Sequence, residues 1–123
     1  LADYFDVDLA KVKFKEPFLT DALLALAAEK ILFDRGSYEK INSYQIGRHR
    51  VEEFKDNKNR VWINDSKATN PDATIAALTP YKTQKIYLIL GGDDKDADQT
   101  KLFETVKEYD LEIFIIGANE NKL

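Results

Sequence analysis

Charged and hydroxyl side chains crowd the loop that follows an apolar stretch at residues 60–64. The loop contains Asp65, Ser66, Lys67, Thr69 and Asn70, and Pro71 then suits the first position of a helix. An ammonium group and a hydroxyl can hold a carboxylate or phosphate, and a carboxylate can accept hydrogen bonds from sugar hydroxyls. Strand ends and helix N-termini are where open α/β sheets bind anionic ligands. The loop therefore predicts a site for an anionic small molecule; the alternative is a capped helix start with a solvated lysine.

A second loop of similar character follows the apolar stretch 85–90. It contains Gly91 and Gly92, then Asp93, Asp94, Lys95 and Asp96. Paired glycines allow a backbone to approach a ligand closely, and Lys95 would supply the charge. The alternative is an Asp-rich surface turn. The spacing is not that of a Walker A loop, which occurs nowhere in the chain.

His49 and Arg50 are the remaining candidates for binding. A lone histidine without a second His or Cys is a poor metal ligand, so no metal site is predicted. Arg50 suits a phosphate clamp because guanidinium binds phosphate through two hydrogen bonds, although ordinary surface packing remains an alternative for both residues. Glu52 and Glu53 are interpreted as a solvated strand edge. No nucleophile–base pair or carboxylate dyad can be identified from the spacings.

The elements around these loops predict an α/β fold. Residues 49–55 and 60–64 form a hairpin, with Trp62 expected in the core. A helix follows from an Asn70 cap, then a strand at 85–90, a helix from about Asp98, and a strand at 111–116. Strands separated by helices of this length indicate βαβ units and a mostly parallel sheet flanked by helices.

The first 47 residues form a separate, mostly helical unit in this interpretation. A short strand is expected around Val12 and Phe14, where apolar residues alternate with lysines. Thr20 is expected to cap a helix that ends at Arg35-Gly36. Ser37 is expected to cap a shorter helix that stops at Gly47, and the domain boundary is placed there.

Composition excludes several classes of protein. The 123 residues carry 18 basic and 22 acidic side chains, and the net charge of −4 argues against nucleic-acid binding. Cysteine is absent, which excludes disulfides and thiolate metal sites. No apolar stretch is long enough to span a membrane and no signal peptide is recognisable, so a cytoplasmic location is expected. Because methionine is also absent, the chain is expected to be a piece of a longer protein.

Three motifs in order resemble the Mur ligase family over residues 48–98. They are His49-Arg50-Val51-Glu52, then Asn64-Asp65-Ser66-Lys67-Ala68-Thr69-Asn70, then Leu90-Gly91-Gly92-Asp93-Asp94-Lys95 with Asp98. The second is the most specific, and is similar to that of the members that add D-glutamate. Pro17 and Phe18 depart from the family pattern, because they stand where the family has a His-Asn pair whose Asn contacts adenine.

The resemblance implies an ATP-dependent amide-bond ligase of peptidoglycan synthesis. In such enzymes ATP phosphorylates the carboxylate of UDP-N-acetylmuramoyl-L-alanine, and the amine of D-glutamate attacks the acyl phosphate. Carried over, Lys67, Thr69 and Lys95, with Ser66, would hold D-glutamate. Arg50 would contact ATP phosphates and Asp65 the ribose, with His49 and Asn70 in the same nucleotide site.

The resemblance also implies a domain assignment. Residues 1–47 would be the tail of a central ATPase domain, and residues 48–123 an incomplete Rossmann-like C-terminal domain. The Mg²⁺ ligands, the P-loop and the UDP pocket would lie outside this chain, so the 123 residues alone are expected to be inactive. A ligase for a different amino acid, or a stand-alone anion-binding α/β domain without catalysis, remain as alternatives.

Overall fold

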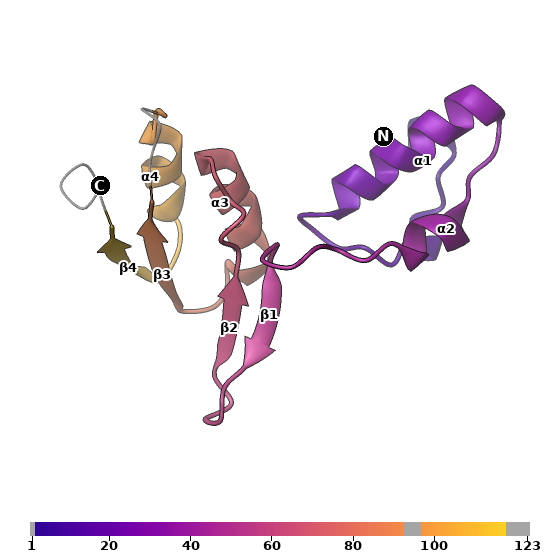
Figure 1. The fold of residues 1–123 in the computed structure, drawn as a ribbon. Helices are drawn as coiled ribbons and strands as arrows, with labels where there is room; N and C mark the ends of the chain where they lie inside the picture. Colours follow the sequence, from indigo (N-terminus) through magenta and orange to yellow (C-terminus); the bar gives the residue numbers. More distant parts are fainter. Residues whose placement is uncertain (1, 93–96, 118–123) are drawn as a thin grey trace. The chain divides into compact units, whose positions relative to one another are not determined.

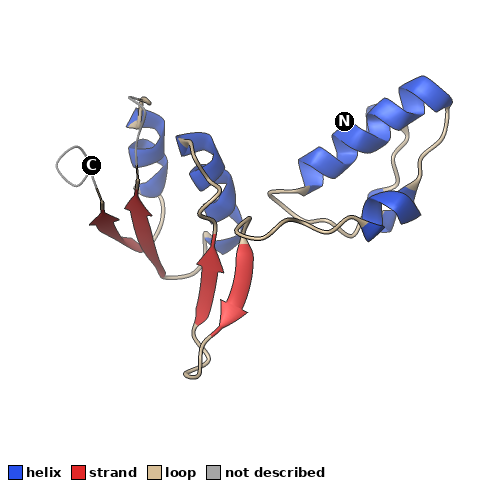
Figure 2. Cartoon of the chain, viewed as in Figure 1, coloured by secondary structure: helices blue, strands red, loops and turns tan. Residues whose placement is uncertain are grey.

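The computed structural model describes residues 2–92 and 97–117, which fall into two compact units (Figure 1). The first unit is Leu1–Gly47 and the second is Arg48–Leu123. Figure 2 shows that the first is helical and that every strand belongs to the second. The mixed α/β class expected from the sequence is confirmed.

The first unit is built on helix α1 (Leu19–Phe33) and the short helix α2 (Tyr38–Ser43), preceded by the 3-10 turns η1 (Asp3–Phe5) and η2 (Leu9–Lys11). Ala22, Leu26 and Ala27 are its buried side chains. The Glu29 carboxylate accepts hydrogen bonds from the hydroxyl and the main-chain N–H of Ser37, both at 2.6 Å. These bonds from Ser37, aided by Arg35, lower the pKa of Glu29 and tie the start of α2 to α1.

The prediction of a strand around Val12 and Phe14 is wrong. Within the described residues this segment is extended but pairs with no strand. Its backbone instead bonds to one side chain, because Asn42 accepts from the Lys13 N–H at 2.9 Å and donates to the Lys11 carbonyl at 2.7 Å. The side-chain amide of Asn42 thus takes the place of a neighbouring strand. Alternation of apolar and polar residues favours a strand but does not supply a partner strand for it.

The helix limits in this unit also differ from expectation. Helix α1 begins before Thr20, because a turn at Lys15 accepts the N–H groups of Phe18 and Leu19 and starts the helix early. It ends at Phe33, and Asp34 takes the left-handed position (φ 50°) that glycine usually occupies. Helix α2 ends at Ser43 rather than at Gly47, and the Ser37 side chain binds Glu29 instead of capping.

Strands β1 (Glu52–Lys55) and β2 (Val61–Asn64) form the predicted antiparallel hairpin, with Phe54 opposite Trp62. Asp56 organises its turn by accepting the N–H groups of Lys58 and Arg60, the Arg60 Nε–H, and the Trp62 indole N–H. Partial burial would raise the pKa of Asp56, but these four hydrogen bonds outweigh it and hold that pKa well below its ordinary value of 3.8.

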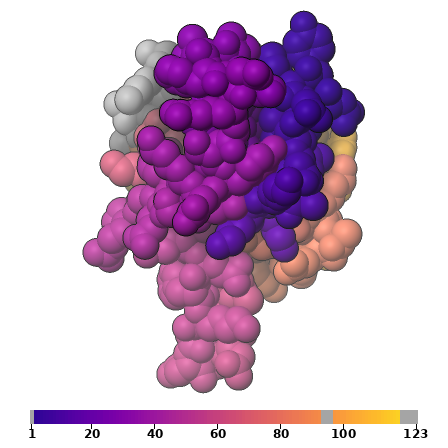
Figure 3. All heavy atoms as spheres, turned by 90° about the vertical axis from the view of Figure 1, so that its right-hand side faces the viewer, coloured from indigo at the N-terminus to yellow at the C-terminus, as the bar shows by residue number. Residues whose placement is uncertain are grey.

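Trp62 is not in the core, contrary to expectation. Its side chain is 41% exposed and stacks on Phe54, with ring centroids 6.4 Å apart. The Arg60 guanidinium also lies over the Trp62 ring, 5.6 Å from its centroid. A two-stranded hairpin buries an aromatic residue only if another layer covers that face, and the hairpin atoms form the narrow lower end of the view in Figure 3.

The second unit continues through α3 (Pro71–Leu78), η3 (Thr79–Tyr81), β3 (Ile86–Gly91), α4 (Thr100–Val106) and β4 (Leu111–Ile116). Strands β3 and β4 are parallel, as a crossover through α4 requires, with Ile86 opposite Leu111 and Gly91 opposite Ile116. Helices α3 and α4 lie side by side (Figure 1), and Lys101 on α4 contacts Asp72 on α3 at 2.6 Å.

The core of this unit lies between the two helices and one face of the β3–β4 pair. Leu78, Leu102 and Val106 are buried there, and alternate residues of both strands pack against them. The parallel pairing expected for this part is therefore present. In the residues that the structure describes, β2 pairs with β1 alone and not with β3, so the two ladders remain separate.

Candidate functional site

The polar loop after β2 is shaped by its own backbone and by the cap of α3. The Asn70 side-chain oxygen accepts the Ala73 N–H at 2.8 Å, and Pro71 opens the helix where a missing N–H costs nothing. Closer to the strand, the Asp65 carbonyl accepts the Ala68 N–H at 2.8 Å. The cap and the turn fix both ends of the loop that carries Lys67.

Two hydrogen bonds, one between main-chain groups and one from a main-chain N–H to a side chain, join this loop to the segment that precedes β1. The Lys67 N–H donates to the His49 carbonyl at 3.1 Å, and the Val51 N–H donates to the Asp65 carboxylate at 3.1 Å. Two groups of candidates separated by about 15 residues in the sequence therefore belong to one structural site. Asp65 is half-buried, and its second carboxylate oxygen can still accept hydrogen bonds.

The segment around Arg50 has an unusual backbone. His49 (φ 63°) and Val51 (φ 47°) both lie in the left-handed region, which a β-branched residue such as Val51 rarely adopts. The Glu52 carboxylate accepts the His49 N–H at 3.0 Å and supports this conformation. Strained backbone held by its surroundings is typical of functional sites, and here it surrounds the exposed Arg50.

The side chains that could hold an anion remain accessible. Ser66, Lys67, Thr69 and Arg50 are exposed, and none of their side-chain polar atoms bonds to protein within residues 2–92 and 97–117. The two joined segments thus carry an accessible ammonium group, a guanidinium group and two hydroxyls, together with one half-buried carboxylate. This set can bind a ligand with both negative charge and sugar hydroxyls.

The glycine loop after β3 is described only in part. Gly91 lies so close to β4 that a Cβ added there would be 2.4 Å from the Ile116 carbonyl oxygen, and Gly92 has φ 109°. Both positions need glycine, the first for close approach and the second for conformation. Lys95 lies outside the described residues, and so do Asp93, Asp94 and Asp96.

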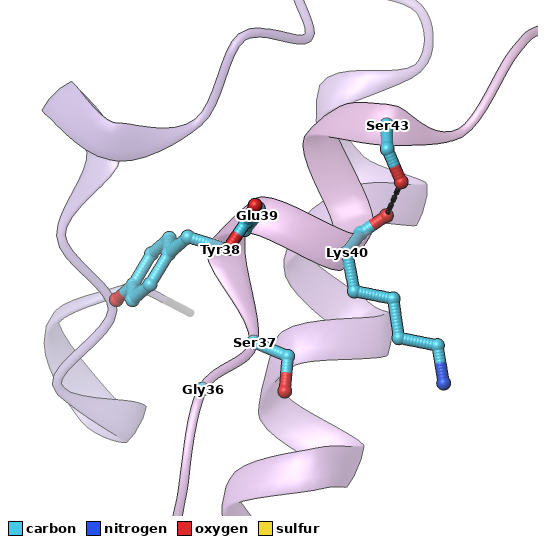
Figure 4. A pocket seen from close by; sticks show the side chains of 6 residues that line it. All are labelled: Gly36, Ser37, Tyr38, Glu39, Lys40 and Ser43. Atoms are coloured by element: carbon cyan, nitrogen blue, oxygen red, sulfur yellow. Dashed lines mark hydrogen bonds between the residues drawn. The ribbon is translucent and has the colours of Figure 1, made fainter.

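A hollow in the described chain lies elsewhere, in the first unit. It has a volume of about 700 Å³, is open to solvent, and is lined by Gly36, Ser37, Tyr38, Glu39, Lys40 and Ser43 (Figure 4). Within this set, Ser43 donates its hydroxyl to the Lys40 carbonyl at 2.8 Å, which is local helix chemistry. None of the candidate residues lines it, so the site rests on the joined loops and not on this hollow.

Two general features bear on function. Among the described residues, no group of three or more His, Cys, Asp or Glu side chains is arranged to hold a metal ion. The described helices include none with the length and apolar character that crossing a membrane requires.

Comparison with known proteins decides the family. The model of the family described as "Mur ligase, glutamate ligase domain" matches residues 49–122, which is more than half of the chain. The chain belongs to the Mur ligase family. The matched range covers both joined loops and the glycine loop, and begins within two residues of the boundary between the two units.

Similar curated proteins within the Mur ligase family carry the name UDP-N-acetylmuramoylalanine–D-glutamate ligase. The protein from Campylobacter jejuni (strain RM1221) is 50% identical over all 123 residues of the chain, which cover 31% of that relative. The Helicobacter pylori (strain ATCC 700392 / 26695) protein is 44% identical over 116 residues, with 86% of the chain and 28% of the relative covered. The chain therefore spans about a third of the length of these Mur ligases.

The structure adds two residues to the site that sequence reasoning missed. Asn64 bonds through its amide to His49 and to the Ser66 N–H, and the partly exposed Glu52 bonds to the His49 backbone. Each of the two acts on a neighbouring residue through a hydrogen bond. The usable signal was position in the chain, since Asn64 directly precedes the candidate Asp65 and Glu52 lies two residues after the candidate Arg50.

Proposed function

We propose that the full-length protein is the ATP-dependent ligase that adds D-glutamate to UDP-N-acetylmuramoyl-L-alanine in peptidoglycan synthesis, and that it works in the cytoplasm. The names of the relatives support this reaction, as does their identity across all or most of the chain. The observation that carries the proposal to this chain is the pair of hydrogen bonds that joins the Lys67 loop to the His49 segment. They bring candidates for amino-acid binding and for nucleotide binding into one site.

The amino-acid side of the site is assigned to Lys67, Thr69 and Lys95, with Ser66 beside them. D-Glutamate carries two carboxylates, and two lysines on separate loops can neutralise both while they orient the attacking amine. Exposure of Lys67 and Thr69 supports this role, because both can reach a ligand without breaking an internal bond. Each charge-assisted contact is worth about 1.5–3 kcal/mol.

The nucleotide side is assigned to Arg50, Asp65, His49 and Asn70. Arg50 suits phosphate oxygens, and the Asp65 oxygen left over from the Val51 bond suits ribose hydroxyls. Asn70 uses its carbonyl oxygen to cap α3, so its amide NH₂ is the group that remains for a ligand.

The chain holds one part of the machinery in this proposal. The Mg²⁺ ligands are assigned to the remaining domains of the full-length protein, as the family resemblance implies; among the described residues no group of three or more His, Cys, Asp or Glu is arranged to hold a metal ion. Residues 1–47 are assigned to the end of the central ATPase domain, and residues 48–123 to the C-terminal domain. When bound with ATP, Mg²⁺ would offset phosphate charge during acyl phosphate formation.

Phosphate release by the full-length protein with Mg-ATP and UDP-N-acetylmuramoyl-L-alanine tests the proposal. Release should require D-glutamate and should not occur with other amino acids. Lys67→Ala should lower kcat/KM for D-glutamate by about 10- to 150-fold, as loss of one charge-assisted contact implies. Lys58→Ala is the matched control, because Lys58 is an exposed lysine in the hairpin turn and bonds to Asp56 through its backbone.

Three results would contradict the assignment. Release that depends on a different amino acid would make the protein a ligase of another specificity. Absence of ATP turnover in the full-length protein would favour a non-catalytic binding domain. An equal loss in Lys58→Ala and Lys67→Ala would separate the loop from the reaction. The 123-residue chain alone should show no turnover.

A further inference from the structure

Asn64, the last residue of β2, connects the two loops of the site through its side-chain amide. Its Nδ2 lies 2.9 Å from Nδ1 of His49, and its Oδ1 accepts the Ser66 N–H at 3.2 Å. Both contacts are within the second unit and both partners flank residues assigned to ligand binding. The amide has one donor end and one acceptor end, so its two contacts define its orientation.

The orientation of Asn64 determines where the proton of His49 lies. The Ser66 main-chain N–H can only donate, so the Asn64 carbonyl oxygen must face it, and the NH₂ group must face His49. An NH₂ group can only donate, and Nδ1 of His49 must therefore accept through its lone pair. The neutral imidazole then carries its proton on Nε2.

Glu52 is the only carboxylate near this ring in the described chain, and its geometry does not favour the other tautomer. Its Oε2 accepts the His49 main-chain N–H at 3.0 Å but lies 3.6 Å from Nδ1, beyond hydrogen-bonding distance. Glu52 thus holds the left-handed backbone of His49, while Asn64 binds the ring. The two neighbours act on different atoms of the same residue.

We propose that Asn64 is a positioning residue that holds His49 in the Nε2–H tautomer, so that the ring presents a fixed donor to an oxygen of the bound nucleotide. This rests on the proposed function. No protein group in residues 2–92 and 97–117 bonds to Nε2, and the ring is 43% exposed, so the donor is accessible. Arg50 adjoins it in the chain, and phosphate and ribose oxygens accept hydrogen bonds.

The tautomer can be measured without turnover. Two-bond ¹H–¹⁵N correlation spectra of the full-length protein, labelled with ¹⁵N-histidine, distinguish Nε2–H from Nδ1–H, and the signal missing in His49→Gln assigns His49. The native protein should show Nε2–H. Asn64→Asp keeps an acceptor for Ser66 but replaces the donor by an acceptor, so it should move the proton to Nδ1. Asn57→Asp makes the same chemical change in the exposed hairpin turn and should leave the ring unchanged.

Kinetics test the ligand side of the proposal. Asn64→Asp should raise KM for ATP by about tenfold or more, as loss of one good hydrogen bond implies, with little change in KM for D-glutamate. Nδ1–H in the native protein, or Nε2–H retained in Asn64→Asp, would overturn the positioning role. A moved proton with unchanged KM for ATP would overturn the contact with nucleotide. Absence of D-glutamate-dependent turnover would instead refute the proposed function. The two failures can be told apart, because the tautomer spectrum is recorded without turnover.

Discussion

Replacing Gly91 by alanine should loosen the parallel β3–β4 pair. The added Cβ would lie 2.4 Å from the Ile116 carbonyl oxygen and 2.6 Å from its Cγ1, whereas ordinary contacts begin near 3.4 Å. The obstacle is backbone, which a side-chain rotation cannot remove. The strands must therefore separate by roughly an ångström at the end of the ladder that leads into the glycine loop.

The magnitude follows from two opposing terms. Forcing a methyl group into a packed site costs about 1–3 kcal/mol. Alanine also lowers the conformational entropy of the unfolded chain, which offsets about 0.4–1 kcal/mol of that cost. The net loss of about 1–2 kcal/mol corresponds to a factor of roughly 5–30 in the equilibrium for local opening.

Hydrogen exchange followed by mass spectrometry on the full-length protein measures this opening. Peptides that cover Ile86–Gly91 and Leu111–Ile116 should exchange roughly 5–30 times faster in Gly91→Ala. Gly47→Ala is the matched control, because a Cβ there would meet nothing within 4 Å. Unchanged exchange in Gly91→Ala, or an equal effect of Gly47→Ala, would refute the reasoning from close approach.

Two further predictions concern the cap of α3 and the hairpin turn. Asn70→Ala should destabilise the first turn of α3 by about 1 kcal/mol, which faster amide exchange would reveal. Asn70→Asp should keep the protection of these amides and raise KM for ATP. An equal loss of protection in both variants would show that the cap is not the cause. For Asp56, whose pKa is lowered, the stabilisation is complete above the ordinary value of 3.8 and is lost as pH falls through the lower folded-state pKa. The Trp62 indole N–H resonance should therefore keep its position from pH 7 down to 3.8 and move only below it, and a midpoint at or above 3.8 would contradict this.

The second unit was largely predictable from the sequence because its signals are local. The hairpin, the Asn70 cap with Pro71, and the strand 111–116 agree with the structure. The first unit was less predictable, since the segment around Val12 depends on a side chain about 30 residues away, Asn42. The prediction that Trp62 is buried was wrong for a related reason. An aromatic side chain on a hairpin is buried only if another layer covers that face of the hairpin.

The sequence by itself determined the α/β class, the Mur ligase family and the types of residue at the site, because motifs, periodicity and caps are properties of neighbouring residues. Tertiary structure decided how those residues act together. The bonds between His49 and Lys67, between Val51 and Asp65, and between Asn64 and the His49 ring join segments about 15 residues apart. Hydrogen bonds depend on distance and direction in space, and these are set only once the hairpin brings the start of β1 beside the end of β2.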